Sequence, residues 1–157
     1  MLRNMLIAAA LFSASPAVAA PRAEFLRDAI RGDTSEIALG RLIEARGATP
    51  QVRSFGAKLV RDHGIGLQQA RNAAARAGLH IVPTMMPEAR NEMVRLEHLR
   101  GRAFDLETRR YMIDDHRKDL AEFRAQAHSG DRATAGLAAA TIPVLQRHLA
   151  LAEAIRG

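Results

Sequence analysis

The chain has 157 residues, a formal net charge of +6 and 48% hydrophobic residues, but only 4% aromatic residues and no cysteine. Without cysteine, disulfides, thiol catalysis and lipid attachment at a cysteine are excluded. The basic residues are interspersed with acidic ones, which indicates a solvated basic surface and argues against nucleic-acid binding. The positive charge leaves open a weak contact with an anionic envelope surface, and the sequence does not identify a protein partner.

Residues 1–19 are predicted to be a signal peptide. Arg3 gives a positive start, residues 5–12 are apolar, and Ala17-Val18-Ala19 is a small-x-small cleavage signal. The apolar stretch is much shorter than the ~20 residues that span a bilayer, so an uncleaved anchor is the lesser alternative. We therefore expect an exported domain at residues 22–156, periplasmic or outer-membrane associated, with no transmembrane segment after cleavage.

Apolar residues recur at helical spacing along nearly all of the remaining chain. The predicted helices span about 22–46, 50–78, 88–99, 102–127 and 131–155. Thr49-Pro50 is a helix start, Gly32-Asp33 is expected to break or kink the first helix, and Pro143 to kink the last. Four main helices with mostly short connections predict an all-α four-helix bundle, and the longer connection with its short extra helix is a candidate crossover.

Each main helix has one ionisable side chain on the face that is expected to be buried. An Asp-His pair occurs twice, as Asp62-His63 and Asp115-His116, and both histidines lie between apolar residues at helical spacing. The first and last helices contribute Glu36 and His148 in the same way. At ~1.5 Å rise per residue, counting from the turn of each predicted hairpin leaves Glu36 and His63 offset by ~5 Å along the bundle, and His116 and His148 by ~7 Å. Residue spacing alone therefore does not place the four side chains in one layer.

Imidazole and carboxylate groups together suit a transition-metal ion such as iron, copper or zinc. The candidate ligands of one such ion are therefore Glu36, His63, His116 and His148. Asp62 and Asp115 point about 100° away from the histidines that follow them, and we expect each to orient a histidine of a neighbouring helix or to pair with an arginine.

A structural interpretation stands beside the metal site, because buried histidines often only hydrogen-bond to a carboxylate or a carbonyl. Asp33-x-x-Glu36 also fits a capping box at a helix start. No nucleophile motif or phosphate-binding glycine loop occurs, which favours a non-enzymatic role. The alternatives are a metal-binding envelope protein, a structural or interaction module without metal, and, third, a metal-dependent redox enzyme with an atypical site.

Several short motifs occur in a specific order across nearly the whole mature chain. They are Glu36-Ile37-Ala38-Leu39-Gly40, Val52-Arg53-Ser54-Phe55 leading to Asp62-His63, Val82-Pro83, Gly101-x-x-Phe104-Asp105, Tyr111-Met112, Asp115-His116 and Pro143-Val144-Leu145-x-x-His148-Leu149. In these motifs the chain resembles the exported bacterial proteins of domain of unknown function family 4142. The resemblance implies a ferritin-like helical bundle in the periplasm or at the outer membrane, and no established activity.

The sequence departs from the related patterns in two respects. Thr108 occupies a position where this family often has tyrosine. Ferritin-like di-iron sites need Glu-x-x-His on two helices, whereas the residues three before His63, His116 and His148 are valine, isoleucine and leucine. The sequence therefore favours a mononuclear, histidine-rich site over a ferroxidase.

Overall fold

The computed structural model describes residues 16–156, with side chains from Pro21 onward, and it is all-helical over this range, as predicted. Residues 1–15 of the predicted signal peptide and residue 157 lie outside the described residues. The helices are α1 (Pro16–Arg46), α2 (Pro50–Arg76), α3 (Pro87–Glu97), α4 (Gly101–Ala127) and α5 (Arg132–Glu153).

α1 differs most from its prediction. It begins at Pro16, because the alanine-rich residues that follow have high helix propensity, and it continues unbroken through Gly32-Asp33. The predicted break was therefore wrong, and so was the capping box. Asp33 lies in the middle of the helix, and its carboxylate bonds the ring of His63 instead of a helix start.

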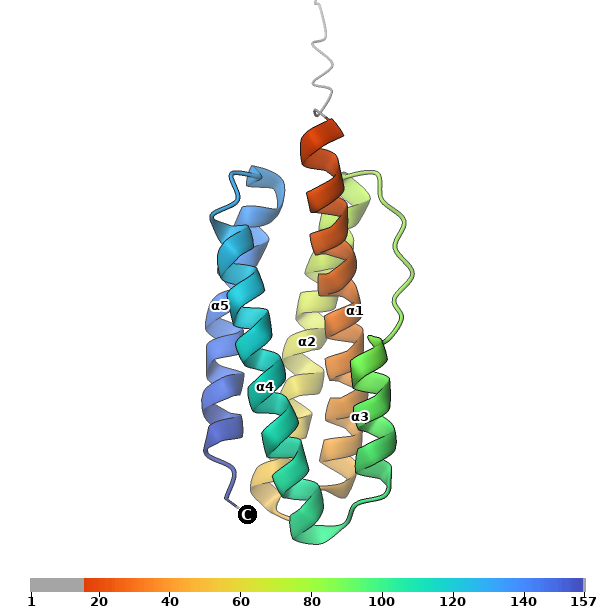
Figure 1. The fold of residues 1–157 in the computed structure, drawn as a ribbon, viewed down its shortest axis with the longest axis vertical. Coiled ribbons are helices and arrows are strands. Elements are labelled where there is room, and N and C mark those ends of the chain that lie inside the picture. The colour runs from red at the N-terminus through yellow and green to blue at the C-terminus, as the bar shows by residue number, and fades with distance from the viewer. Residues whose placement is uncertain (1–15, 157) are drawn as a thin grey trace, which may run out of the picture.

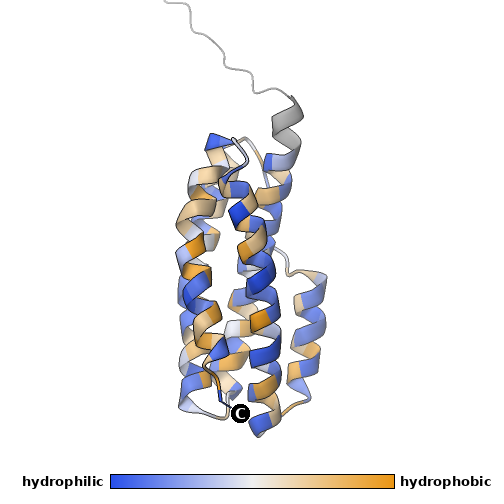
Figure 2. Ribbon diagram, turned by 60° about the vertical axis from the view of Figure 1, so that its left-hand side comes forward, coloured by the Kyte–Doolittle hydropathy of each residue, from blue (hydrophilic) through white to orange (hydrophobic). Residues whose placement is uncertain are grey.

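The long helices form two antiparallel hairpins, α1 with α2 and α4 with α5, that pack side by side (Figure 1). Residues 77–86 and α3 carry the chain back along the bundle, so that α2 and α4 run in the same direction (Figure 1). Hydrophobic and hydrophilic residues alternate around each helix (Figure 2), which is the pattern of helices that bury one face.

Polar side chains fix the helix ends. Thr49 accepts a hydrogen bond from the backbone N–H of Val52 at the start of α2. The buried carboxylate of Asp105 accepts the backbone N–H groups of Ala48 and Thr49, which fastens the α1–α2 turn to α4. Asp131 caps α5 and forms a bidentate ion pair with Arg22, which joins the start of α5 to α1.

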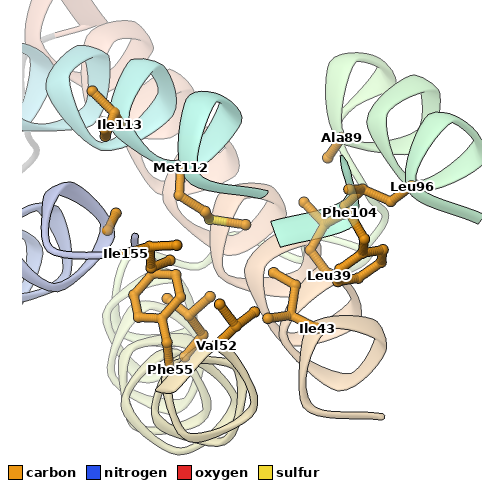
Figure 3. Packing of buried hydrophobic residues seen from close by; sticks show 12 residues of the cluster. Leu39, Ile43, Val52, Phe55, Ala89, Leu96, Phe104, Met112, Ile113 and Ile155 are labelled. Atoms are coloured by element: carbon orange, nitrogen blue, oxygen red, sulfur yellow. The ribbon is translucent and has the colours of Figure 1, made fainter. Parts of the chain in front are cut away.

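The apolar core is divided into two clusters. The larger lies toward the α1–α2 turn (Figure 3) and contains Leu39, Ile43, Val52, Phe55, Leu59, Ala89, Leu96, Phe104, Met112, Ile113, Ala152 and Ile155. The smaller, toward the other end of that hairpin, contains Leu26, Ala29, Ile30, Ala70, Ala73 and Ala74. The two clusters leave a layer between them in which polar side chains gather.

None of the described helices has an apolar stretch long enough to cross a membrane.

Candidate functional site

Polar residues, four of them buried and four half-buried, occupy the layer between the two apolar clusters. Along α1 and α2, the polar residues lie in the sequence between residues of the smaller cluster and residues of the larger one. In α1, for example, Asp33 and Glu36 lie between Ile30 of the smaller cluster and Leu39 of the larger one. The side chains of this layer are Asp33 and Glu36 of α1, Asp62 and His63 of α2, Asp115, His116 and Asp119 of α4, and His148 of α5. The four candidate ligands named from the sequence are therefore at the same height in the bundle, and each is at most 5% exposed.

The three histidines come together in the centre of this layer. One ring nitrogen of each of His63, His116 and His148 lies within 4.8 Å of the others. The ring centroids are 5.1 Å apart for His63 and His148, 5.4 Å for His116 and His148, and 5.9 Å for His63 and His116. The offset expected from residue counting is therefore absent from the packed bundle.

Each imidazole has one ring nitrogen bonded to an acceptor outside the cluster. His63 Nδ1 lies 2.8 Å from Asp33 Oδ1, and His148 Nε2 lies 3.0 Å from Asp62 Oδ2. His116 Nδ1 lies 3.0 Å from the carbonyl oxygen of Met112. A carbonyl or a carboxylate accepts, so these three nitrogens carry the N–H.

The remaining nitrogens, His63 Nε2, His116 Nε2 and His148 Nδ1, therefore face the inside of the cluster, and those of His116 and His148 carry lone pairs when these two rings are neutral. His116 Nε2 and His148 Nδ1 are 3.4 Å apart, and His63 Nε2 is buried with no hydrogen-bond partner among the described residues. Two facing lone pairs repel unless a proton or a metal ion lies between them. The cluster is arranged to hold a cation.

The pKa values of His116 and His148 argue against a proton as the cation that the cluster holds. Burial, followed by the nearby His63, lowers the pKa of His148 to about 4. Burial also lowers the pKa of His116 well below its ordinary value, and His63 and His148 lower it further. Both rings are therefore neutral at neutral pH, which is the form that binds a metal.

The orienting role expected of Asp62 matches the geometry, and that of Asp115 does not. Burial works to raise the pKa of Asp62, but hydrogen bonds from His148, Lys58 and Arg61 outweigh it and lower that pKa to about 2. The carboxylate is thus ionised beside His148. Asp115 instead faces Glu36, and these two with His116 supply atoms within 4.8 Å of one another.

Carboxylates gather on the α1–α4 side of the layer. Burial, and then the neighbouring Asp115, raises the pKa of both Glu36 and Asp119 well above the ordinary range. Burial also raises the pKa of Asp33 and Asp115. Glu36 Oε2 lies 3.8 Å from His63 Nε2, so the carboxylate group adjoins the histidine cluster.

A cavity of about 470 Å³ reaches this group from the surface between α1 and α4. Its inner wall includes Glu36, His63 and Asp115, whereas Asp114 and Lys118 lie at its exposed edge. The site is thus connected to solvent on its acidic side.

Sequence reasoning did not find Asp33, Asp119 or Tyr111 as members of this region. Asp33 precedes Glu36 by three residues and Asp119 follows Asp115 by four, so each pair shares a helix face. This spacing could have indicated both aspartates from the sequence. Tyr111, the only tyrosine of the chain, lines the same cavity. Thr108 is fully buried, and its hydroxyl has no hydrogen-bond partner among the described residues.

The fold and site define an all-helical bundle with a buried cluster of histidines and carboxylates. Comparison with protein families matches residues 8–155 to the family described as Domain of unknown function (DUF4142), so the chain belongs to that family, as its sequence motifs predicted. No match was found among curated proteins or among solved structures.

Proposed function

We propose that this protein is an exported, ferritin-like four-helix bundle that binds one transition-metal ion through His63, His116 and His148. The observation that carries the proposal is the direction of the hydrogen bonds. All three imidazoles donate outward, to Asp33, Asp62 and the carbonyl of Met112, and turn their other ring nitrogens inward. Histidines that ligate metals are held in this way.

The donor set indicates the class of metal. Three neutral imidazoles suit zinc, copper or iron, and three histidines with a remaining position for water or a carboxylate form a common zinc arrangement. Glu36 adjoins the histidines and is the carboxylate available for that position. The ferritin-like assignment is supported by one long crossover between two antiparallel hairpins.

Export is supported by the leader pattern of residues 1–19. Fractionation of cells that express the full chain, followed by N-terminal sequencing, tests it. We expect the protein in the periplasmic or outer-membrane fraction with Ala20 as its first residue. An intact leader in the cytoplasmic fraction would contradict this part of the proposal.

Elemental analysis of the untagged protein, purified without chelator, tests metal binding. We expect close to one metal ion per chain, lost in the His63→Ala, His116→Ala double variant. A His80→Ala, His98→Ala double variant is the matched control, because both of these histidines are exposed.

Cobalt provides a second readout that does not depend on the metal acquired during growth. The wild type should bind Co²⁺ with the intense visible absorption of a four-coordinate, nitrogen-ligated site. If neither the purified protein nor protein incubated with iron, copper, zinc or cobalt holds metal, the proposal is wrong. The histidines would then serve only the packing of the core.

A further inference from the structure

A second pocket lies on a different face of α1 from the acidic cavity. Its volume is about 300 Å³, and it is formed between α1 and the segment that runs alongside the bundle from α2 to α3 (Figure 1). The residues that line it are Ala23, Arg27, Arg31, Leu79, His80, Ile81, Val82 and Thr84. None of these residues is acidic, and we call this site the arginine pocket.

The two arginines of the pocket have no anionic partner. Arg27 and Arg31 are one helical turn apart on α1, so their side chains share a face of the helix. Among the described side chains, no carboxylate forms an ion pair with either of them, whereas Arg22 and Arg110 do form ion pairs. The Nε atom of Arg31 is buried and has no hydrogen-bond partner among the described residues. Because a buried donor without an acceptor is costly, an acceptor from outside the chain would stabilise this side chain.

The wall of the pocket that faces α1 is fixed at both of its ends. Leu79 and Ile81 pack against the smaller apolar cluster. A few residues further on, the backbone N–H of Met86 donates a hydrogen bond of 2.8 Å to Ser35 Oγ of α1. The pocket is therefore already formed in the free protein, which lowers the entropic cost of binding a ligand there.

The donors of the pocket match a phosphate group. A guanidinium group donates paired hydrogen bonds to phosphate oxygens, and Thr84 and His80 add a hydroxyl and an imidazole N–H. No carboxylate on the wall repels an anion. The volume of about 300 Å³ is at the lower end of the range for small-ligand pockets, so it leaves room for a substituent on the phosphate.

We propose that the arginine pocket binds an anionic phosphate group, with Arg27 and Arg31 as its principal donors. A free phosphate and the headgroup of an anionic lipid share this chemistry. Val82 lines the pocket and is 63% exposed, so it gives a bound lipid an apolar contact that a free phosphate does not use. The site is separate from the proposed metal site, because none of its residues belongs to the histidine cluster.

Amide NMR spectra recorded during a titration with inorganic phosphate, at constant ionic strength, test the proposal. We expect saturable shifts at residues 80–84 that fit one dissociation constant. The Arg27→Gln, Arg31→Gln variant should bind about ten-fold more weakly or worse, because it loses the charge-assisted hydrogen bonds. The Arg41→Gln, Arg147→Gln variant removes the same charge from exposed positions outside the pocket and should bind as the wild type does.

Sedimentation with vesicles distinguishes the two sources of phosphate. Phosphatidylcholine vesicles that contain phosphatidic acid present a phosphate monoester, and vesicles of phosphatidylcholine alone are the control. Sedimentation that requires phosphatidic acid, and that is lost in both the arginine variant and Val82→Ser, would identify a lipid headgroup. Saturable binding of inorganic phosphate without sedimentation would identify a free phosphate, and either result supports the site.

The proposal is wrong if the wild type gives no saturable shifts, if the shifts lie at exposed arginines outside the pocket, or if both double variants lose binding equally. The folded His63→Ala, His116→Ala variant should bind phosphate as the wild type does. Loss of phosphate there would assign the anion to the metal site and also overturn the proposal. Because the wild-type shifts locate the anion on their own, the proposal stays testable even if the arginine variant fails to fold.

Discussion

His148 Nε2 and Asp62 Oδ2 lie 3.0 Å apart, although 86 residues separate them in the chain. Asp62 is also held by Lys58 and Arg61, so the carboxylate stays ionised and its position is restricted. The contact fixes the tautomer of His148 and turns its Nδ1 lone pair toward His116 and His63. The first Asp-His pair therefore serves two helices at once: His63 contributes to the cluster, and Asp62 orients the histidine that α5 contributes.

Asp62→Asn should weaken metal binding without unfolding the protein. An asparagine keeps the shape but removes the charge that holds His148, and loss of such a partner typically lowers metal affinity ~10–100-fold. Competition with a chromophoric chelator measures the change. Asp114→Asn, at an exposed position, is the control, and equal affinity in the wild type and Asp62→Asn would contradict the orienting role.

The metal-free protein should lose stability as the pH falls from about 6.5 toward 4. His148 has its ordinary pKa of 6.5 when unfolded and about 4 when folded, so the unfolded state takes up the proton first. The stability that the neutral His148 ring contributes is complete above its pKa in the unfolded state, 6.5, and is lost as the pH falls toward its pKa in the folded state, about 4. Urea unfolding at several pH values measures it.

His148→Gln provides the comparison for that pH dependence. Glutamine can still donate a hydrogen bond to Asp62 but does not titrate. Its free energy of unfolding should therefore depend less on pH between 6.5 and 4 than that of the wild type. An unchanged slope would mean that other groups cause the acid sensitivity.

Glu36→Gln should stabilise the metal-free protein at pH 8 more than at pH 5. Burial and then Asp115 raise the pKa of Glu36, so its favourable, protonated form is lost as the pH rises through the folded-state pKa. Glutamine avoids a buried negative charge, and we expect the melting temperature to rise by roughly a few °C at pH 8. A lower melting temperature at pH 8, measured by calorimetry with chelator present, would contradict this account.

Gly56→Ala should destabilise the fold by about 1–3 kcal/mol, because a Cβ at this position would collide with the α1 backbone at Gly40 and Glu44. Gly136→Ala in α5 is the matched control. A Cβ there meets no atom within 4 Å, and alanine should raise stability by up to about 1 kcal/mol through helix propensity. Denaturant unfolding should therefore give opposite signs for the two variants.

Asp105→Ala should cost about 1–3 kcal/mol, since it leaves the backbone N–H groups of Ala48 and Thr49 without their acceptor at the partly buried α1–α2 turn. Asp114→Ala, an exposed change on the same helix, should cost much less. The difference in free energy of unfolding between the two variants measures what the link between the α1–α2 turn and α4 contributes.

The sequence alone determined the helical class, the helix boundaries near Thr49, Gly101 and Asp131, and the family, because apolar periodicity, caps and ordered motifs are local properties of the chain. It also identified Glu36 and the three histidines as residues of buried helix faces, since burial follows from the same periodicity. The capping-box alternative at Asp33 was wrong because a local pattern does not show that a distant His63 competes for the same carboxylate.

Only the tertiary structure decided how these residues meet. The packing of the helices placed them in one layer between two apolar clusters, whereas counting residues from each turn leaves them offset. The hydrogen bonds of His63, His116 and His148 to partners outside the cluster then determined which ring nitrogens face inward. The approach of α1 to α4 likewise brought Glu36, Asp115 and Asp119 to one cavity, because contacts between helices depend on packing across the whole bundle rather than on local sequence.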